Sequence, residues 1–580
     1  MTQRRISLLA SFALILLMAV QPASAQAAAR PSMAGSGVSV IVRADAGANR
    51  QVRAAIARTG GTVERAIGLI RGFVARVPAG SIRTLRHSAG VTAVTANVPV
   101  ELASSAMTSE ETDLGTLDNV RHAIGADAYW AAGYTGEGVD VAVIDSGVAP
   151  VPGLSAAGSV INGPDLSFES QDPDLRYLDT FGHGTHMSGI IAGSDPAHGF
   201  YGVAPGARIV SVKVADAFGT TDLSQILAAI DWVVKHRHDH SGELDLDIRV
   251  LNLSFGTNGV QDYTIDPLAY AVEQAWKKGI FVAVAGGNEG YGTEKLNNPA
   301  YDPFVMAVGA SNPNATADPA DDLVAEFSSR GDAQRHPDLV APGTSIVSLR
   351  DPGSYIDRTN PAAVVGPDGL LFRGSGTSQA TAVVSGAAAL VIQQRPGIKP
   401  DELKKLLTST SNSLPGADPQ AQGAGQLDLA DALGAPTPSS KEAKQGWPKA
   451  KGTGSLESAR GGLHLGHGGV KLKGAKNIFG DTFNSAAWSS KSDADSSWDD
   501  GSFLGRSWTG RSWTSTSWTG IAWKGRSWTG SSWAGRSWTS AAWTGRSWTS
   551  SGWSGGAWTG RSWTSSTWTG NTWSSAGWGT

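Results

Sequence analysis

The sequence predicts an α/β fold with a parallel sheet and helices on both faces, preceded by a small α+β unit and followed by a repetitive tail. Three observations lead to this prediction. Between about residues 112 and 433, compact apolar runs alternate with helical stretches, as in parallel sheets that are buried on both faces. Residues 37–100 alternate strand and helix patterns over a shorter length. Beyond residue 481, tryptophan recurs with a fixed period.

Composition sets the limits of the interpretation. A chain of 580 residues is long enough for more than one domain. Its net charge of −4 is too small to indicate a nucleic-acid or membrane partner, and no nucleic acid is expected. The chain contains no cysteine, which excludes disulfide bonds and a thiol nucleophile. Its stability must therefore come from packing and from any bound cations.

Residues 1–25 have the pattern of a bacterial export signal. Arg4 and Arg5 form a basic start, residues 6–20 are apolar, and Ala-Ser-Ala at 23–25 is a small-residue cleavage site. The alternative is a membrane anchor, but the apolar run is short for a bilayer span. We therefore expect a secreted protein that is extracellular or associated with the cell wall.

The small N-terminal unit has the pattern of a ferredoxin-like split βαβ sandwich. Apolar alternation predicts strands and capping residues predict helices. Strands are expected at 38–42, 62–67, 73–77 and 91–94, and helices at 49–58 and 81–87.

The larger α/β region contains strand and helix patterns of the lengths that a doubly covered sheet requires. The strands are short apolar runs, expected at 141–144, 208–214, 248–253, 280–284 and 305–308. The helices are longer, and are expected at 223–235, 267–278 and 378–393.

Four glycine-rich strings in this region each contain one reactive side chain. They are VAVIDSGV at 141–148, HGTHMSG at 183–189, AGGNEG at 285–290 and GTSQAT at 376–381, with Asp145, His183, Asn288 and Ser378. A serine hydroxyl becomes a nucleophile beside an imidazole base that a carboxylate orients, and an amide can hold the resulting oxyanion. Taken singly, each residue has a structural alternative: a strand-end cap, a core histidine, a turn residue or a helix cap.

The local setting of each residue favours chemistry over these alternatives. Asp145 ends an apolar strand, where a parallel sheet opens its ligand crevice. Ser378 begins a helix, so the positive helix end faces a developing oxyanion. His183 also begins a helix, and Asn288 follows two glycines after a strand. Together the four residues predict a serine peptidase.

These strings resemble the signature segments of the subtilisin-like serine peptidases (the subtilase family), over about residues 112–433. The resemblance implies that Asp145 orients the base His183, that Ser378 is the nucleophile and that Asn288 is the oxyanion amide. It implies no cofactor for catalysis, with protein or peptide substrates. It further implies four substrate-binding residues, namely Ser254 and Gly256 in LNLSFG and Ala285 and Gly287 on one wall of the specificity pocket.

The chain departs from the family pattern after the nucleophile. Gln379 stands where the family usually has methionine, and Ala382 and Val383 stand where it usually has Pro-His. These departures leave a second hypothesis open: a catalytically inactive surface-binding protein whose peptidase fold carries the tail.

The resemblance also suggests roles for the N-terminal unit and the acidic loops. Residues 26–111 resemble the inhibitor-like propeptide of the family, which would occupy the cleft and be cut off near residues 100–115; a permanent accessory domain is the alternative. Structural calcium is common in the family, and acids crowd two loops, at positions 165, 172, 174 and 179 and at 318, 321 and 322. Such loops are more often merely solvated, so no metal ligands are assigned.

The C-terminal part is expected to lie outside the catalytic domain. Residues 434–480 are rich in Gly, Lys, Ser and Pro and are expected to form a linker. In the tail, 481–580, tryptophan occupies every fifth position from Trp508 to Trp578, and Trp488 and Trp498 are in phase with it. Either this tail is disordered, or its indoles and arginines bind cell-wall or extracellular polysaccharide with high avidity.

Overall fold

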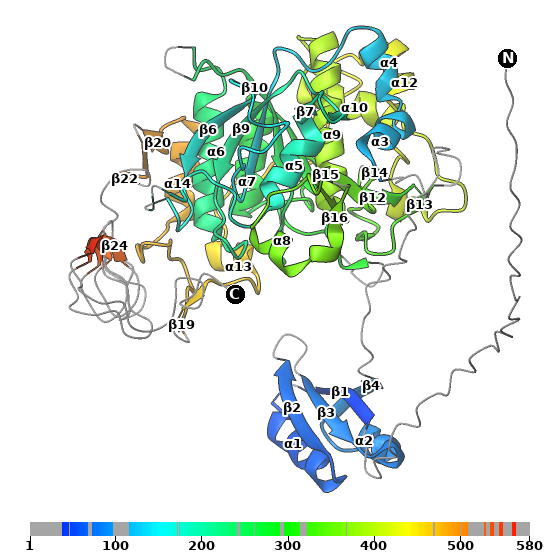
Figure 1. Ribbon diagram of the computed structural model, residues 1–580, viewed down its shortest axis with the longest axis vertical. Helices are drawn as coiled ribbons and strands as arrows, with labels where there is room; N and C mark the ends of the chain where they lie inside the picture. Colours follow the sequence, from blue (N-terminus) through cyan, green and yellow to red (C-terminus); the bar gives the residue numbers. More distant parts are fainter. Residues whose placement is uncertain are drawn as a thin grey trace, which may run out of the picture. The chain divides into compact units, whose positions relative to one another are not determined.

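The computed structural model describes residues 38–96 and 115–507 with short gaps, and four short strands between residues 527 and 563 (Figure 1). The gaps are at 46, 68–71, 171, 173, 241–243, 260, 291–294, 314–321, 367, 468–469 and 500. The expected export signal and the expected processing region lie outside the described residues. The chain divides into two compact units, residues 1–108 and 109–580.

The first unit is a four-stranded antiparallel sheet with two helices. Its elements are β1 (Val38–Ala44), α1 (Asn49–Arg58), β2 (Thr62–Ile67), β3 (Gly72–Val77), α2 (Ile82–Arg86) and β4 (Val91–Ala96). The strand order is β2-β3-β1-β4, with every pair antiparallel. Val42, Ile56 and Leu85 are fully buried in its core. This βαββαβ arrangement confirms the predicted ferredoxin-like sandwich.

The second unit is built on an eight-stranded, mostly parallel sheet. The strands are β5 (Asp140–Asp145), β6 (Val160–Asp165), β9 (Arg208–Lys213), β10 (Ile248–Leu253), β11 (Phe281–Ala285), β12 (Met306–Asn312), β13 (Leu323–Val324) and β14 (Leu339–Pro342). Their order is β13-β12-β11-β10-β5-β9-β6, and β14 also pairs with β12. The β12–β13 pair is antiparallel, and the other neighbours are parallel.

Two pairs of helices pack on this sheet (Figure 1). One pair is α6 (Leu223–His236) and α7 (Pro267–Lys277), which contact β5 and β11 respectively. The other is α5 (His183–Ala192) and α9 (Thr377–Gln394), which contact β5 and β10 among other strands. All six residues of β5 are buried, so both faces of the sheet are covered. The predicted α/β architecture is confirmed.

Shorter elements complete the second unit. The remaining helices are α3 (Leu117–Ala123), α4 (Ala126–Ala131), α8 (Tyr355–Thr359), α10 (Pro400–Ser409), α11 (Pro419–Gln422), α12 (Leu429–Gly434), α13 (Leu456–Arg460) and α14 (Ser485–Asp493). The remaining strands up to residue 507 are β7 (Ser194–Asp195), β8 (Phe200–Tyr201), β15 (Ile346–Leu349), β16 (Val364–Val365), β17 (Leu371–Gly374), β18 (Gly466–His467), β19 (Val470–Lys471), β20 (Trp498–Asp499), β21 (Ser502–Phe503) and β22 (Arg506–Ser507). Among the described residues, no helix is both long and apolar enough to cross a bilayer.

The expectation of a linker at residues 434–480 is wrong. Leu456, Ile478 and Phe479 are at most 1 % exposed and belong to the core of the second unit. Helix α13, yellow in Figure 1, contacts both α6 and α7. Only a few of its side chains are buried, and they are widely spaced along the sequence. The rest of the segment is polar, so its composition resembles that of a linker.

The start of the expected tail is also part of this core. Trp488 is 1 % exposed, and its indole Nε1 donates to Asp231 of α6 at 2.8 Å. Trp498 is buried as well, in β20, which contacts α6. Further along the tail the structure describes four strands, β23 (Ser527–Trp528), β24 (Ala534–Trp538), β25 (Gly545–Trp548) and β26 (Gly560–Trp563). Two tryptophans that share the five-residue phase of the repeat, Trp488 and Trp498, are therefore part of the folded second unit.

Candidate active site

Three neighbouring strands end at one edge of the parallel sheet, and each end leads into a predicted site residue. In the register of the sheet, Val143 of β5 lies opposite Asn252 of β10, and Asn252 lies opposite Ala283 of β11. Two residues further on, the strands reach Asp145, Ser254 and Ala285. Because parallel strands end at a common edge, these residues lie side by side at the position where ligands bind in such sheets.

Asp145 and His183 form the central contact of this edge. The imidazole Nδ1 of His183 lies 2.9 Å from both carboxylate oxygens of Asp145. Asp145 is 7 % exposed, and its Oδ1 also accepts the backbone N–H of Ser146 at 2.8 Å. A carboxylate only accepts, so Nδ1 carries the proton and Nε2 is left as the base. Burial lowers the pKa of His183, but the charges of Asp145 and Asp179 and the Asp145 hydrogen bond outweigh it and raise the pKa above its usual value.

The start of α5 holds His183 in place through a residue that the sequence prediction had assigned only to an acidic loop. Asp179 is 2 % exposed and accepts from the backbone N–H groups of Gly182 at 2.7 Å and Thr185 at 2.8 Å. Its carboxylate therefore satisfies free N–H groups at the helix N-terminus. Gly184 is required here because a Cβ at that position would lie 2.2 Å from the carbonyl oxygen of Gly147.

Ser378 lies at the second residue of α9 and is linked to the end of β10. Its Oγ donates to the carbonyl oxygen of Ser254 at 2.9 Å, and Ser254 Oγ donates back to the carbonyl oxygen of Ser378 at 3.1 Å. A hydroxyl has one proton, so in this rotamer Ser378 does not donate to His183. Ser378 is thereby held at the end of β10, the strand next to β5, which carries Asp145. Rotation about the Cα–Cβ bond of Ser378 would release its hydroxyl from the carbonyl of Ser254.

Asn288 and the start of α9 present two N–H donors to one small space. Asn288 Oδ1 accepts from the backbone N–H of Thr377 at 2.8 Å and from its hydroxyl at 3.0 Å. This contact orients the amide so that Nδ2 is available as a donor. A Cβ at Gly376 would lie 2.8 Å from Gln379 Oε1, 3.4 Å from Asn288 Nδ2 and 3.6 Å from the backbone nitrogen of Ser378. Glycine is therefore needed here, and the two N–H donors lie close to the same point, as an oxyanion site requires. The sequence prediction did not include Thr377.

The four predicted substrate-binding residues lie around these groups. Ser254 and Ala285 are buried at the strand ends. Gly256 is half-buried, and a Cβ there would lie 2.6 Å from Cβ of Asn297. Gly287 donates its N–H to Thr377 Oγ1 at 3.2 Å and accepts from the N–H of Ser329 at 3.0 Å. Both main-chain polar groups of Gly287 are therefore hydrogen-bonded within the protein. At this edge Gly287 contributes to the shape of the pocket wall.

The residues that depart from the family pattern are accommodated in the core. Ala382 and Val383 are fully buried in α9. Gln379 is 7 % exposed, and its amide lies against the backbone of Gly374 and Gly376. His186, the second histidine of the HGTHMSG string, is 5 % exposed with Nε2 3.1 Å from the carbonyl oxygen of Phe372. Burial, and then the charge of His183, lower its pKa to about 4.

The acidic loops have structural partners in the part of the chain that the structure describes. Asp165 accepts from the hydroxyl of Ser167 at 2.6 Å and from the N–H of Tyr177 at 3.0 Å, and Asp179 holds the start of α5. Positions 318 and 321 lie outside the described residues. No group of three or more His, Cys, Asp or Glu residues among those described is placed to hold a metal ion. A calcium site therefore stays a prediction.

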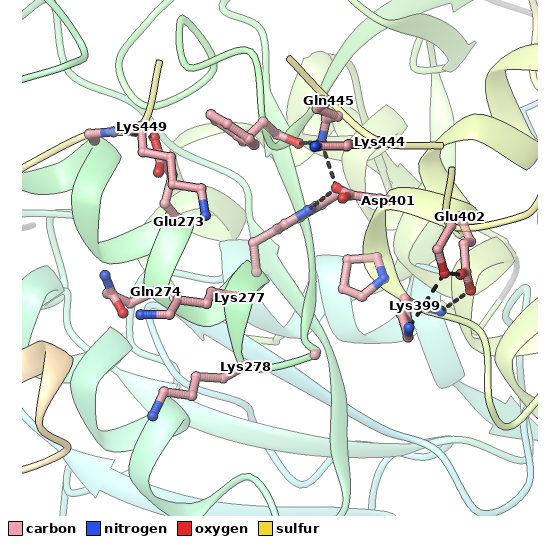
Figure 2. A pocket seen from close by; sticks show the side chains of 16 residues that line it. Glu273, Gln274, Lys277, Lys278, Lys399, Asp401, Glu402, Lys444, Gln445 and Lys449 are labelled. Atoms are coloured by element: carbon pink, nitrogen blue, oxygen red, sulfur yellow. Dashed lines mark hydrogen bonds between the residues drawn. The ribbon is translucent and has the colours of Figure 1, made fainter. Parts of the chain in front are cut away.

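The second unit also has a cavity of about 600 Å³, and none of the predicted site residues lines it (Figure 2). It lies between the end of α7, the start of α10 and residues 440–450. Five lysines line it, at positions 277, 278, 399, 444 and 449. Two of them are engaged in ion pairs: Lys277 with Asp493, which is exposed, and Lys278 with Asp495, which is partly buried.

Comparison with known proteins identifies two families along the chain. The model of the "Subtilase family" matches residues 136–425, and that of the "Putative peptidase inhibitor domain" matches residues 16–97. The serine protease AprX of Bacillus subtilis (strain 168) is 38% identical over 306 residues, which cover 52% of this chain and 67% of AprX. The minor extracellular protease Epr of the same organism is 34% identical over 267 residues, 46% of this chain and 34% of Epr. A subtilisin of Bacillus pumilus is 35% identical over 294 residues, 50% of this chain and 90% of that protein.

Proposed function

The chain belongs to the subtilase family of serine endopeptidases, and we propose that it hydrolyses peptide bonds through an acyl-enzyme on Ser378. The observation that carries this proposal is the 2.9 Å contact between Asp145 and His183 at the edge of the sheet. Ser378 is bound to the same edge through Ser254, and Asn288 is bound to the start of α9 beside Ser378. An acid, a base, a nucleophile and an amide donor at one edge are the parts that acyl transfer needs.

In the proposed mechanism, His183 acts as the base. The hydroxyl of Ser378 rotates from the carbonyl of Ser254 towards His183 Nε2, which takes its proton as Oγ attacks the substrate carbonyl. Asp145 keeps Nδ1 protonated and stabilises the imidazolium that forms. His183 then gives the proton to the leaving amine, and a water molecule hydrolyses the ester by the same route.

The oxyanion of each tetrahedral intermediate is proposed to lie between Asn288 and the start of α9. There it accepts from Asn288 Nδ2 and from the backbone N–H of Ser378, while the positive end of α9 adds to the stabilisation. Both donors are fixed before the reaction, because Thr377 orients the amide and the helix fixes the backbone.

A labelling experiment tests this function. The secreted protein should react with a fluorophosphonate probe at Ser378, identified by mass spectrometry of the labelled peptide. Ser378→Ala should lose both labelling and peptide hydrolysis, whereas Ser375→Ala, at an exposed neighbouring serine, should keep both. A folded wild-type protein that neither reacts with the probe nor cleaves peptides would favour the surface-binding alternative.

We further propose that the protein is secreted and made as a zymogen. The pattern of residues 1–25, the relative named an extracellular protease and the match to an inhibitor domain over residues 16–97 support this proposal. N-terminal sequencing of active protein from the medium should give a start between residues 100 and 115. A start before residue 60 in the active form would contradict the propeptide role.

For the tryptophan tail we propose binding to wall or extracellular polysaccharide, since indoles stack on sugar rings and repetition adds avidity. The full-length protein carrying Ser378→Ala should be retained on wall polysaccharide. A variant with alanine in place of the tryptophans from Trp508 to Trp578 should not be retained. Equal retention of both would remove the idea.

A further inference from the structure

A second cavity, of about 260 Å³, lies next to the helix that begins at His183. Two loops form most of its wall: residues 175–180, which precede α5, and residues 351–354, which follow β15. Ala217 and Phe218 on a third loop complete the wall together with Arg358. None of these positions belongs to the catalytic residues proposed above.

The loop after β15 is fastened to the residues directly before His183. The N–H groups of Tyr355 and Ile356 donate to the carbonyl oxygens of Thr180 and Phe181, each at 3.0 Å. The rings of Phe181 and Tyr355 also stack, with centroids 6.0 Å apart. The wall of the cavity is therefore fixed to the segment that leads directly into the proposed base, His183.

Asp351 is a wall residue of this cavity with an unused oxygen. Its residue is 9 % exposed, and Oδ2 has no hydrogen-bond partner among the described residues. A buried carboxylate oxygen without a partner is costly, so it marks a place where a donor is missing. Burial, and then the charges of Asp179 and Asp357, raise the pKa of Asp351 to about 8, so the group is protonated at neutral pH when alone and ionises when a cation bound beside it lowers the pKa.

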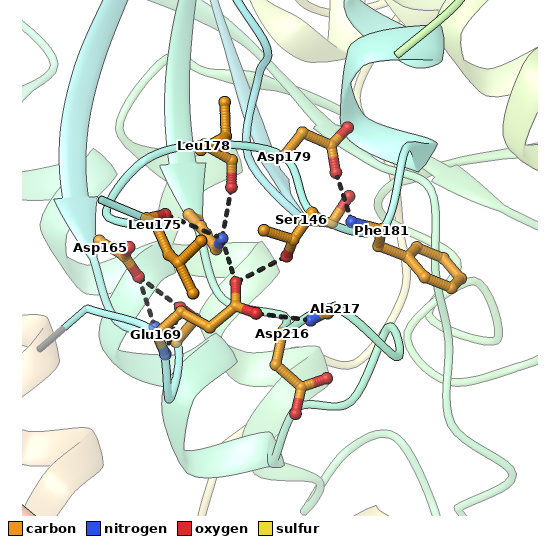
Figure 3. A network of polar contacts seen from close by, with 12 residues as sticks. Ser146, Asp165, Glu169, Leu175, Leu178, Asp179, Phe181, Asp216 and Ala217 are labelled. Carbon is orange, nitrogen blue, oxygen red and sulfur yellow. Dashed lines mark hydrogen bonds and ion pairs between the residues drawn. The ribbon is translucent and has the colours of Figure 1, made fainter. Parts of the chain in front are cut away.

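Carboxylates gather next to this cavity, among them those of Asp165, Glu169 and Asp179 (Figure 3). Lys213, fully buried, pairs with Glu169 at 2.5 Å and also lies near Asp165 and Asp179. Arg350 is engaged by Asp357 at 2.6 Å. Arg358 also lines the cavity, and its Nη1 donates to the carbonyl oxygen of Gly353, a neutral partner that leaves the charge of Arg358 in place. The five carboxyl groups named here, Asp351 included, still outnumber the three cations, so a further positive charge is favoured beside Asp351.

The shape and chemistry of the cavity favour an organic cation over a metal ion. Asp179 has its oxygens occupied by N–H and hydroxyl donors from residues 181, 182 and 185, whereas calcium requires six to eight oxygen ligands. Leu175, Leu178 and the 47 % exposed ring of Phe218 offer apolar surface to a hydrocarbon stem. An aromatic ring also attracts a cation over its face.

We propose that this cavity is a substrate subsite for a lysine or arginine side chain, whose charged group is bound by Asp351 and whose stem packs on Phe218. The proposal rests on the peptidase function proposed above and adds a determinant of specificity to it. Substrates with a basic residue at the matching position are cleaved faster, because the carboxylate gains a charge-assisted hydrogen bond.

Peptide kinetics test the subsite. Internally quenched peptides derived from one cleaved sequence carry Lys, Arg or Gln at each position in turn around the scissile bond. At one position, Lys or Arg should raise kcat/KM about 10-fold or more over Gln, and Asp351→Asn should reduce this ratio to about one. Asp368→Asn, an exposed acid of the same chain region outside the cavity, should keep the wild-type ratio.

Other outcomes distinguish failure of the proposed subsite from failure of the proposed peptidase function. An active enzyme with no basic preference, or with a preference that survives Asp351→Asn, overturns the subsite and leaves the peptidase function intact. The subsite is also overturned if Asp351→Asn removes a calcium-induced rise in Tm without changing the ratio. Protein that neither cleaves nor reacts with fluorophosphonate contradicts the peptidase function itself. If Asp351→Asn does not fold, Phe218→Ala decides, since it must reduce the same ratio.

Discussion

Arg460 forms a buried, two-pronged ion pair with Asp222. The guanidinium Nε lies 2.7 Å from Asp222 Oδ2 and Nη2 lies 3.2 Å from Oδ1, and both side chains are 1 % exposed. Asp222 is also the N-cap of α6, where it accepts from the N–H of Ser224 at 2.9 Å. The pair therefore links the C-terminal segment, residues 434–507, to the start of α6, a core helix of the second unit.

Arg460→Met should destabilise the protein strongly, because it leaves the carboxylate of Asp222 buried without its counter-ion. Removal of one partner from a buried pair costs about 3–5 kcal/mol. Urea unfolding in a Ser378→Ala background, which prevents self-digestion, measures the loss. Lys277→Gln is the matched control, since its pair with Asp493 is about half exposed and should contribute about 0–1 kcal/mol. Equal effects of the two variants would contradict the fastening role.

The site of chain truncation should separate the folded unit from the repeat. A chain ending at residue 507 should secrete and cleave peptides like the full-length protein, because it keeps Trp488, Trp498 and Phe503 in the core. A chain ending at residue 433 should not accumulate, since it uncovers α6 and α7; the loss of Trp488 alone is comparable to a core Trp→Ala change, about 3–5 kcal/mol. Active, soluble protein from the shorter chain would show that the C-terminal segment is dispensable.

The candidate site could be predicted because its information is local. Asp145, His183 and Ser378 each stand in a glycine-rich string at a strand end or helix start, so position and chemistry coincide in a few residues. The rotamer of Ser378 could not be predicted in this way. Its partner, the carbonyl of Ser254, is distant in sequence and is brought near by the packing of α9 on β10.

The prediction of a linker at residues 434–480 is wrong because few of their side chains are buried in the core. Helix α6 nevertheless indicates that another part of the chain must cover it. Residues 223–234 of α6 are buried all round the helix, and such a helix needs a cover on its outer side as well. Asp231, in the middle of α6, receives that cover through Trp488 and Ser492. A buried acid on an apolar helix thus indicates a polar partner elsewhere in the chain.

Asp145→Asn should change both the rate and its pH dependence. In the wild type the pKa of His183 lies above its usual value, and the base works only when neutral, so kcat/KM should fall as the pH drops through that raised pKa. Without the charge of Asp145, burial dominates and lowers the pKa of His183, which moves the acid limb to lower pH. The rate at the optimum should fall by about 10⁴-fold, as for the orienting acid of subtilisin.

The same interaction contributes to stability with a defined sign. Because the pKa of His183 is raised by folding, the stabilisation by Asp145 is fully present below the unfolded-state pKa of about 6.5 and is lost as the pH rises through the folded-state pKa. Unfolding of Ser378→Ala with and without Asp145→Asn should therefore differ more at pH 5.5 than at pH 8.5. A difference that is independent of pH would contradict the charge interaction.

Asn288→Ala tests the oxyanion site. In the proposed mechanism the amide Nδ2 donates to the oxyanion of the tetrahedral intermediate. Its loss should therefore lower kcat by about 10²–10³-fold, the range found for this donor in subtilisin, with little change in KM. Thr377→Val should give a smaller decrease in kcat, because it removes the hydroxyl that orients Asn288 Oδ1 at 3.0 Å but keeps the backbone N–H contact at 2.8 Å. Thr381→Val is the control, since the hydroxyl of Thr381 bonds to the carbonyl of Thr377 within α9. If Asn288→Ala raises KM and leaves kcat unchanged, Asn288 binds the ground state of the substrate and the oxyanion assignment is wrong.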